Sequence, residues 1–390
     1  MATPTPRTAH PFAMYDEMQA QPQAMTATLA ADAAQRDHIA RELAGTHAAT
    51  ETIIGPGFLM PSMVGAGRIW LVGCGTAYHA ALTAAEWFRQ GTEGILDVRA
   101  MEAFEFAHYS THKPRVHDTL VALSHSGLPT ATLAAAARAK ADGMYTVALT
   151  AAPTSPLADI CDETLVTTTV TTSASTYTIS HLTMLTALAD LLRRTVGHLR
   201  QEQAQAEALT AAVATLPDLA QAMLTVEPTI TALVDALPMT FPLIIAGGGP
   251  NWYTALEGAL KVREAAYLPA TGMQMEEVVH GPIASIDATT VVMLIAPQGP
   301  ARRRAFDILG ALRHVSATTI VLTSADDAEL AAAATHALAL PVSNELFSSI
   351  PATVAMQLFA YWLAIKRGSN PDRIRRDQPQ WLAARESYTR

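Results

Sequence analysis

Short apolar runs without a polar break alternate with alanine-rich helical stretches along most of this chain. A strand covered on both faces is apolar throughout, and parallel sheets are the sheets that are usually covered in this way. The pattern therefore predicts an α/β fold with two tandem domains, each a flavodoxin-like parallel sheet between layers of helices. The runs lie at 68–75, 119–123, 146–149 and 165–168 in the first half, and at 242–249, 290–296, 319–323 and 337–340 in the second.

Changes in composition along the chain suggest where its parts begin and end. We expect helices at about 25–48 and a polar, helical connector between the two domains. The expected parts are a helical leader at 1–50, a first domain at 51–200, a connector at 201–238, a second domain at 239–369 and an arginine-rich tail at 370–390.

Charge and cysteine content exclude several classes of protein. The 390 residues carry a formal net charge of −9 without a basic run, which argues against a nucleic-acid partner. Cys74 and Cys161 form no CxxC pattern, so we expect a reducing compartment and no structural zinc. Residues 1–24 lack the apolar core of a signal peptide, and the apolar stretch 352–365 is too short to span a bilayer. We therefore expect a soluble, cytoplasmic protein without a membrane partner.

A predicted helix after the run at 242–249 carries two carboxylates and an ammonium on one stripe. At 100° per residue, Glu257, Lys261 and Glu264 lie within roughly 60° of arc, and most residues between them are apolar. An acid, a base and a cation on such a helix suit proton-transfer chemistry. The same spacing also fits a helix stabilised by ion pairs three and four residues apart. His280 follows in a turn closed by glycine and proline.

Hydroxyl-rich turns follow apolar runs of the first half, at 124–130 and at 171–176. Free N–H groups at the start of a helix favour an anion, and hydroxyl groups add donors. With the glycine turn at 73–76, these turns predict a cradle for a phosphate or a polyol, and ordinary N-capping is the alternative. The loop at 296–299 of the second half has no serine, so the two halves look specialised. The candidate binding residues are Gly75, Thr76, Ser124, His125, Ser126, Thr130 and Ser175.

Together, these motifs resemble the sugar isomerase (SIS) domain family, and within it the isomerase half of the glutamine–fructose-6-phosphate amidotransferases. The resemblance covers about residues 50–384. It rests on GCGTAYHA at 73–80, SHSG at 124–127, AST at 174–176, EGALK at 257–261 with Glu264, EVVHGP at 277–282 and DQP at 377–379.

The resemblance implies roles for individual residues. Glu264 would move the proton between C1 and C2 of an open-chain sugar. His280 would assist ring opening, commonly from the neighbouring subunit of a dimer. Glu257 and Lys261 would support the site, and the serines of the loop at 124–127 would hold a 6-phosphate.

Several residues depart from the family pattern. No segment resembles the glutaminase half, and no N-terminal cysteine nucleophile is present, so we expect no use of glutamine. Ala77 stands where the family has a serine in its first loop, and Pro129 replaces a threonine that contacts phosphate, for which Thr130 or Thr132 is a candidate substitute. Ala384 stands at the position of the imine-forming lysine, so an aminating synthase is not expected.

The arginines of the tail add a candidate anion clamp. The planar guanidinium groups of Arg375 and Arg376 suit a phosphate or a carboxylate, and a solvated tail is the alternative.

We therefore expect an aldose–ketose isomerase that acts on a hexose with an anionic 6-substituent, most simply a phosphate, through a cis-enediol. The alternatives are an aminosugar-6-phosphate deaminase or deglycase, and a regulator that binds a sugar phosphate without catalysis. We expect no metal, no cofactor and a homodimer in which His280 acts across the interface.

Overall fold

The computed structural model describes residues 7–45, 50–53, 59–62, 67–115, 117–167, 174, 176–199, 203–341 and 345–388. The chain divides into two compact units that do not follow chain order. The N-terminal sheet unit comprises Ala24–Thr169 and Ser180–Leu216. The C-terminal sheet unit comprises Met1–Gln23, Val170–Ile179 and Pro217–Arg390.

The N-terminal sheet unit contains a five-stranded sheet with the order β4-β3-β5-β6-β7, in which all neighbouring strands are parallel. Its strands are β3 (Ile69–Gly73), β4 (Val98–Glu102), β5 (Thr119–Leu123), β6 (Tyr145–Thr150) and β7 (Glu163–Val166). Its helices are α2 (Ala33–Gly45), α3 (Thr76–Gly91), α4 (Ala103–His108), α5 (Thr130–Ala141), α6 (Pro156–Ile160), α7 (Ile179–His198) and α8 (Gln203–Ala214). A separate antiparallel pair joins β1 (Thr50–Ile53) to β2 (Leu59–Ser62).

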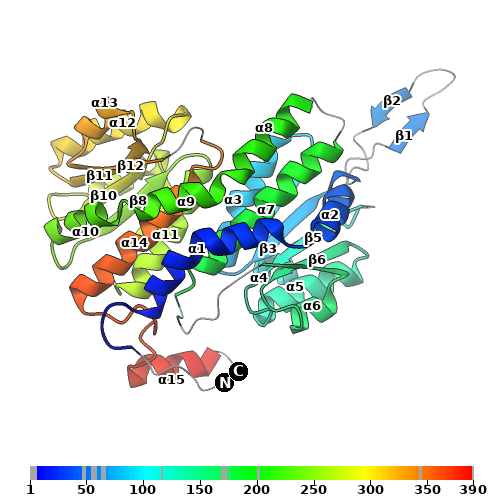
Figure 1. Ribbon diagram of the computed structural model, residues 1–390, viewed down its shortest axis with the longest axis horizontal. Helices are drawn as coiled ribbons and strands as arrows, with labels where there is room; N and C mark the ends of the chain where they lie inside the picture. The colour runs from blue at the N-terminus through cyan, green and yellow to red at the C-terminus, as the bar shows by residue number, and fades with distance from the viewer. Residues whose placement is uncertain are drawn as a thin grey trace. The chain divides into compact units, whose positions relative to one another are not determined.

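The C-terminal sheet unit repeats this topology (Figure 1). Its parallel sheet has the order β12-β11-β10-β8-β9, which matches the first sheet strand for strand. Its strands are β8 (Leu243–Gly247), β9 (Ala270–Gln274), β10 (Val291–Ile295), β11 (Thr318–Ser324) and β12 (His336–Leu340). Its helices are α9 (Leu216–Leu224), α10 (Glu227–Ala236), α11 (Pro250–Ala265), η1 (Glu276–Val279), η2 (Pro282–Ser285), α12 (Pro300–His314), α13 (Ala328–Ala333), α14 (Ser349–Arg367) and α15 (Pro379–Tyr388). The helix α1 (Ala13–Ala30) contributes to both units.

Helices cover both faces of each sheet. On one face of the first sheet, apolar side chains of β3, β5 and β6 pack against α4, α5 and α6. On one face of the second sheet, β8, β10 and β11 pack against α12, α13 and η1. The opposite faces bear α3 in the first unit and α11 in the second, and α14 packs against α11. The sequence prediction of a double α/β fold with parallel sheets is therefore confirmed.

The most apolar stretch of the sequence lies inside the protein. Most side chains of α14 are buried, which explains its high content of apolar residues. In the described part of the chain, no single helix is long and apolar enough to cross a membrane. One pair, Gln203–Leu224 with Glu227–Ala236, would be long and apolar enough together but is bent by 47°.

Several elements differ from the sequence prediction, among them the antiparallel pair of β1 and β2, which was not predicted. The strands β4 and β9 were not predicted, because they are edge strands with partly exposed side chains and no continuous apolar run. The first helix begins at Ala13 rather than near Met25. The buried residues of this helix include Met14, Met18 and Met25, which are spaced as on one face of a helix. This spacing predicts a helix, but residues 1–24 were assessed only for the apolar core of a signal peptide.

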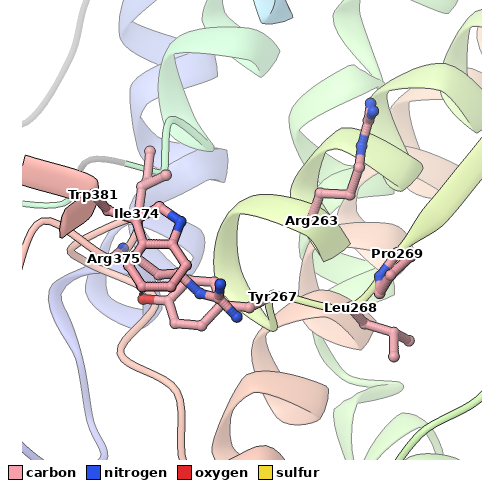
Figure 2. Close-up of a pocket in the computed structure, with 7 residues that line it drawn as sticks. All are labelled: Arg263, Tyr267, Leu268, Pro269, Ile374, Arg375 and Trp381. Carbon is pink, nitrogen blue, oxygen red and sulfur yellow. Dashed lines mark hydrogen bonds between the residues drawn. The ribbon is translucent and has the colours of Figure 1, made fainter. Parts of the chain in front are cut away.

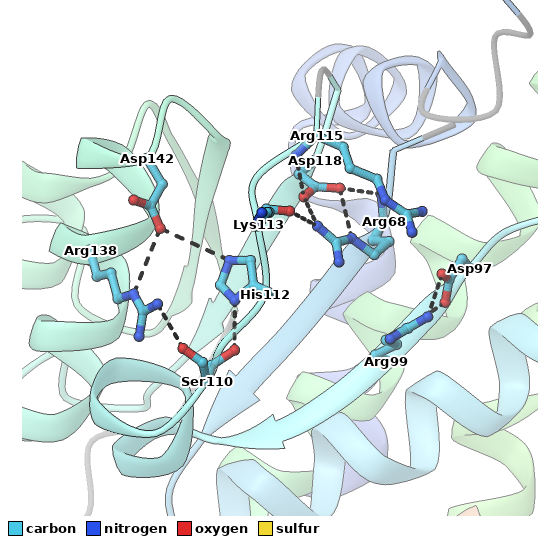
Figure 3. A network of polar contacts seen from close by, with 10 residues as sticks. All are labelled: Arg68, Asp97, Arg99, Ser110, His112, Lys113, Arg115, Asp118, Arg138 and Asp142. Atoms are coloured by element: carbon cyan, nitrogen blue, oxygen red, sulfur yellow. Dashed lines mark hydrogen bonds and ion pairs between the residues drawn. The ribbon is translucent and has the colours of Figure 1, made fainter. Parts of the chain in front are cut away.

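A buried polar network ties the loop after α4 to the first sheet (Figure 3). The Arg68 guanidinium lies 2.6 Å from an Asp118 carboxylate oxygen, and it also donates to the Lys113 carbonyl at 2.6 Å. His112 lies in the same loop, where its Nδ1 is 2.6 Å from the Ser110 hydroxyl and its Nε2 is 3.9 Å from Asp142. These polar contacts, in addition to apolar packing, hold the irregular loop after α4 against the sheet.

Candidate functional site

The same kind of glycine turn connects β3 to α3 in one unit and β8 to α11 in the other. Gly75 precedes α3 with φ 54° and ψ −125°, and Gly249 precedes α11 with φ 54° and ψ −134°. Such left-handed backbone favours glycine, and neither helix has a side-chain cap. The helices α3 and α11 therefore begin at the carboxyl ends of interior strands, where folds of this kind bind ligands.

The stripe predicted on α11 is assembled and buried. Lys261 Nζ lies 3.3 Å from Glu257 Oε1 and 2.5 Å from Glu264 Oε2, and it donates to the Tyr177 carbonyl at 3.2 Å. The side chains of Lys261 and Glu257 are 0% and 1% exposed, whereas that of Glu264 is 22% exposed. The ion pairs that the spacing suggested do form, but inside the protein rather than on its surface.

The two carboxylates keep the buried ammonium charged. Burial by itself would lower the pKa of Lys261, but the opposite charges of Glu257 and Glu264 outweigh burial and raise this pKa. Glu264 alone of the three has a partly exposed side chain.

His280 does not contact this cluster within the described residues. It follows η1 with an exposed side chain, and its Nε2 lies 2.8 Å from Glu276 Oε1. Arg304 also binds Glu276, through Nε at 2.5 Å and Nη2 at 2.8 Å, and these hydrogen bonds lower the pKa of Glu276. The structure therefore shows that Glu276 positions His280. The sequence analysis did not predict this pair, although a spacing of four residues could have suggested it.

The serine loop after β5 forms a tight turn. Ser124 is buried and its Oγ accepts the Gly127 N–H at 3.0 Å, while the half-buried Ser126 accepts the Leu128 N–H at 3.4 Å. Gly127 has φ +65°, and a β-carbon at this residue would collide with the Ser155 side chain. A hydroxyl that accepts one hydrogen bond can still donate another, so both serines can serve an anion.

The histidine of this loop supports it through the backbone. The His125 carbonyl accepts the Ala151 N–H at 3.2 Å and the Thr150 hydroxyl at 3.1 Å. Burial lowers the pKa of His125, which favours the neutral imidazole.

The two threonines proposed to replace the missing phosphate contact lie in different surroundings. Thr132 is buried, and its hydroxyl lies 3.6 Å from Cys74 Sγ, whose pKa burial raises to about 11. Thr130 is exposed at the first position of α5. Thr130 is therefore the better placed of the two. Thr76 begins α3, and its carbonyl lies 3.3 Å from Nδ1 of the buried His181.

The second hydroxyl-rich turn is only partly described, and Ser175 lies outside the described residues. The buried Thr176 hydroxyl donates to the Pro371 carbonyl at 2.6 Å. This contact and the Lys261–Tyr177 hydrogen bond place 176–177 beside α11 and the tail within one unit. Tyr177 was not predicted to matter, because a backbone carbonyl leaves no trace in the residue pattern.

The tail arginines lie on and near a pocket of about 400 Å³ (Figure 2). The Arg375 guanidinium lies 4.6 Å from the ring centroid of Tyr267 and 4.5 Å from that of Trp381, so it stacks on both rings. The remaining lining residues are Arg263, Leu268, Pro269 and Ile374. Arg376 is half-buried next to Arg375. The anion clamp predicted for Arg375 and Arg376 stays a prediction. Ala384 is exposed on α15.

The comparisons with known proteins agree with the repeated topology. The family model of the SIS domain matches residues 62–191 and 242–367. Glutamine–fructose-6-phosphate aminotransferase (isomerizing) of Pyrococcus horikoshii is 32% identical over 313 residues, which are 79% of this chain and 50% of that protein. The same-named protein of Zymomonas mobilis is 28% identical over 316 residues, 79% of this chain and 51% of that protein. The chain thus spans about half the length of the curated relatives it matches.

Solved structures show the same fold. The C-terminal domain of glucosamine-fructose-6-phosphate aminotransferase from Francisella tularensis has a TM-score of 0.82 at 21% identity, covering 94% of this chain and 99% of that one. Tagatose-6-phosphate ketose/aldose isomerase from Escherichia coli has a TM-score of 0.74 at 21% identity, covering 94% and 96%. With two matched segments on two parallel sheets of identical order, the chain belongs to the SIS domain family and carries two copies of this domain.

Proposed function

We propose that the protein is an aldose–ketose isomerase that acts on a hexose with an anionic 6-substituent, most simply a 6-phosphosugar. The observation that carries the proposal is the buried Glu257–Lys261–Glu264 cluster, in which only Glu264 has a partly exposed side chain. Relatives and structural neighbours whose names specify 6-phosphosugars add support.

Glu264 is the proposed proton carrier. As a carboxylate it would remove the proton from the carbon next to the carbonyl and return it one carbon over, through a cis-enediol. Lys261, whose side chain is 0% exposed, would stabilise the negative charge that develops on the enediol oxygen through Glu264. Glu257 keeps the ammonium charged, and no amine stands at Ala384 to form an imine with a ketose.

Two further roles complete the proposal. His280, with its exposed ring and its Glu276 partner, would assist ring opening in the neighbouring protomer of a dimer. The hydroxyl groups of Ser124 and Ser126 and the exposed Thr130 would bind the anionic substituent, together with the N–H groups near Gly75 and Thr76. Ser175 and the pair Arg375 and Arg376 stay candidates for further contacts with the substrate.

The decisive experiment replaces Glu264 by glutamine. We expect Glu264→Gln to slow turnover roughly 100-fold to 10,000-fold, because a positioned general base contributes about that much. Binding of a 6-phosphosugar is expected to stay within a few-fold, since the amide keeps the size of the side chain. Solvent deuterium uptake at C1 and C2, followed by NMR for a panel of 6-phosphosugars, measures turnover. The control is Glu329→Gln, which changes a side chain that is 70% exposed.

The same samples separate the two alternatives. Release of ammonia from glucosamine 6-phosphate by the wild-type protein would favour a deaminase, the activity named for a structural neighbour from Thermotoga maritima. Binding of a 6-phosphosugar by the wild-type protein without any deuterium uptake would favour a regulator.

A further inference from the structure

A pocket of about 400 Å³ lies where the end of α11 meets the tail of the C-terminal sheet unit (Figure 2). Apart from Arg263 and Arg375, the described residues that line it are aliphatic or aromatic. Sites for small molecules have about this volume, and they combine a mostly apolar wall with a few polar groups. The pocket therefore has the size and the composition of a ligand site.

The guanidinium group of Arg375 has donors that the protein does not use. Its Cζ lies 4.6 Å from the ring centroid of Tyr267 and 4.5 Å from that of Trp381, so these rings stack on its faces. The N–H groups lie in the plane of the guanidinium and point outward from its edge, so stacking leaves them available. Nε is buried and has no hydrogen-bond partner in the described part of the chain. Because a buried donor without a partner is costly, we expect an acceptor that the chain itself does not supply.

The positive charge of the pocket is not neutralised by its own residues. Arg263 is exposed on the last turn of α11 and donates from Nε to the Ala259 carbonyl at 3.3 Å. Among the residues that the structure describes, neither Arg263 nor Arg375 forms an ion pair with a carboxylate. Asp377 is exposed and does not line the pocket. The last turn of a helix favours a cation, which accounts for Arg263 but not for Arg375.

Hydrogen bonds and a strained backbone fix the wall that carries Arg375. Tyr267 Oη accepts the Arg375 N–H at 3.0 Å and donates to the Asn370 carbonyl at 2.8 Å. Tyr267, Ile374 and Arg375 have φ angles of 54°, 48° and 57°. Left-handed backbone is unfavourable for residues with a side chain, above all for a β-branched isoleucine, and it is common at ligand sites. The fold thus keeps Arg375 at the pocket against a local cost in free energy.

The pocket is distinct from the Glu257–Lys261–Glu264 cluster. None of these three residues is among those that line it. Arg263 and Glu264 are consecutive, so their side chains leave α11 about 100° apart. The pocket therefore lies on another side of the helix than the proposed proton carrier.

We propose that this pocket is a second ligand site, which binds a small carboxylate with an apolar body. The planar carboxylate matches the edge of the Arg375 guanidinium, Arg263 adds a second positive charge, and the apolar body packs on the aliphatic wall. The inference does not rest on the isomerase proposal, and it assigns Arg375 to this ligand rather than to the sugar.

The first test compares three probes by isothermal titration. The wild-type protein should bind one molecule of 4-phenylbutyrate per chain. The neutral 4-phenylbutanamide should bind about ten-fold more weakly or less, because it lacks the charge. Acetate should show no saturable binding, because it lacks the apolar body. Absence of saturable 4-phenylbutyrate binding, or equal binding of the amide, would overturn the proposal.

The second test substitutes the arginines. Arg263→Met and Arg375→Met should each weaken binding of 4-phenylbutyrate about ten-fold or more, because a charged donor to the carboxylate is lost. Arg263 is exposed, so Arg263→Met is expected to fold even if loss of the stack loosens the tail in Arg375→Met. The matched control is Arg303→Met, on α12 of the same unit, which changes a side chain that is 85% exposed and should bind like the wild type. Wild-type affinity in Arg263→Met would contradict the inference.

The third test separates this pocket from the proposed substrate site. The affinity for 4-phenylbutyrate should be unchanged in the presence of millimolar fructose 6-phosphate, and also in Glu264→Gln. Competition between the two compounds would place Arg375 in the substrate site and rule out a separate pocket. If the isomerase proposal fails, so that no deuterium is taken up, 4-phenylbutyrate should still bind.

Discussion

Lys261 shows how a single buried cation can define a site. Moving an ammonium out of water costs several kcal/mol, and its hydrogen-bonded neighbours must offset that cost. Here Glu257, Glu264 and the Tyr177 carbonyl surround Nζ, so the cation stays charged. The arc that joins the three side chains is readable from residue numbers, but their burial is not. Burial arises because α11 packs on one side against β9 and on another against α14.

His112 makes the stability of the folded chain sensitive to acid. Its side chain is 4% exposed and packs against the rings of Trp70 and Phe106. Burial lowers the pKa of His112, and the charges of Arg138 and Arg68 lower it further. As the pH falls through about 6.5, His112 becomes protonated in the unfolded chain but stays neutral in the folded chain. The free energy of unfolding therefore falls. Below the lowered folded pKa, both states are protonated and the loss stops growing.

We therefore predict that His112→Gln flattens the loss of unfolding free energy between about pH 7 and pH 5. Urea unfolding at a series of pH values measures this slope. His314→Gln, at an exposed site on the last turn of α12, is the control and should leave the slope unchanged. Equal slopes for the wild type and His112→Gln would show that another group carries the acid sensitivity.

At the scale of elements, the edge strand β9 determines how closely α11, the helix that carries the proposed chemistry, packs on the sheet. A β-carbon on Gly272, in β9, would lie 2.5 Å from the Ala255 carbonyl oxygen and 2.6 Å from Leu256 Cα. The backbones of β9 and α11 can approach this closely only because residue 272 has no side chain. The strand was not predicted from the sequence, yet it supports α11 about one and a half helical turns before Lys261.

We predict opposite effects for two glycine-to-alanine substitutions. Gly272→Ala should lower the free energy of unfolding by about 1–3 kcal/mol, since backbone atoms must move to admit a methyl group. Gly310→Ala, at an exposed site in α12 with open space around it, should raise stability by up to about 1 kcal/mol through helix propensity. Urea unfolding compares the two, and a neutral Gly272→Ala would contradict the close approach.

At the scale of the whole molecule, segments that are distant in the sequence build one unit. Asp372 accepts the N–H groups of Ala13 and Met14 at 2.9 and 2.8 Å, and so caps the start of α1. Glu17 on α1 accepts the Thr178 hydroxyl at 2.8 Å. These contacts bring the two ends of the chain and a middle segment into the C-terminal sheet unit. No local sequence pattern predicts these contacts, because each joins residues more than a hundred positions apart.

The proposed dimer makes a prediction that only an assembly can satisfy. If His280 serves the neighbouring protomer, mixing Glu264→Gln with His280→Asn should restore roughly a quarter of the wild-type activity, since half of the random dimers gain one intact site. Each variant alone should stay nearly inactive. Activity is measured by deuterium uptake after subunit exchange. Mixtures no more active than either variant would place His280 and Glu264 of one protomer in the same site.

From the sequence alone, the fold class and the residues of the α11 stripe could be determined. Buried parallel strands are apolar throughout and helical spacing is fixed at 3.6 residues per turn, so both leave local patterns. Only the tertiary structure decided that Lys261 is fully buried, that Glu276 holds His280, and that Arg375 stacks on Tyr267 and Trp381. The physical reason is that burial, and contacts between separate elements, depend on how those elements pack, and a local pattern does not record packing.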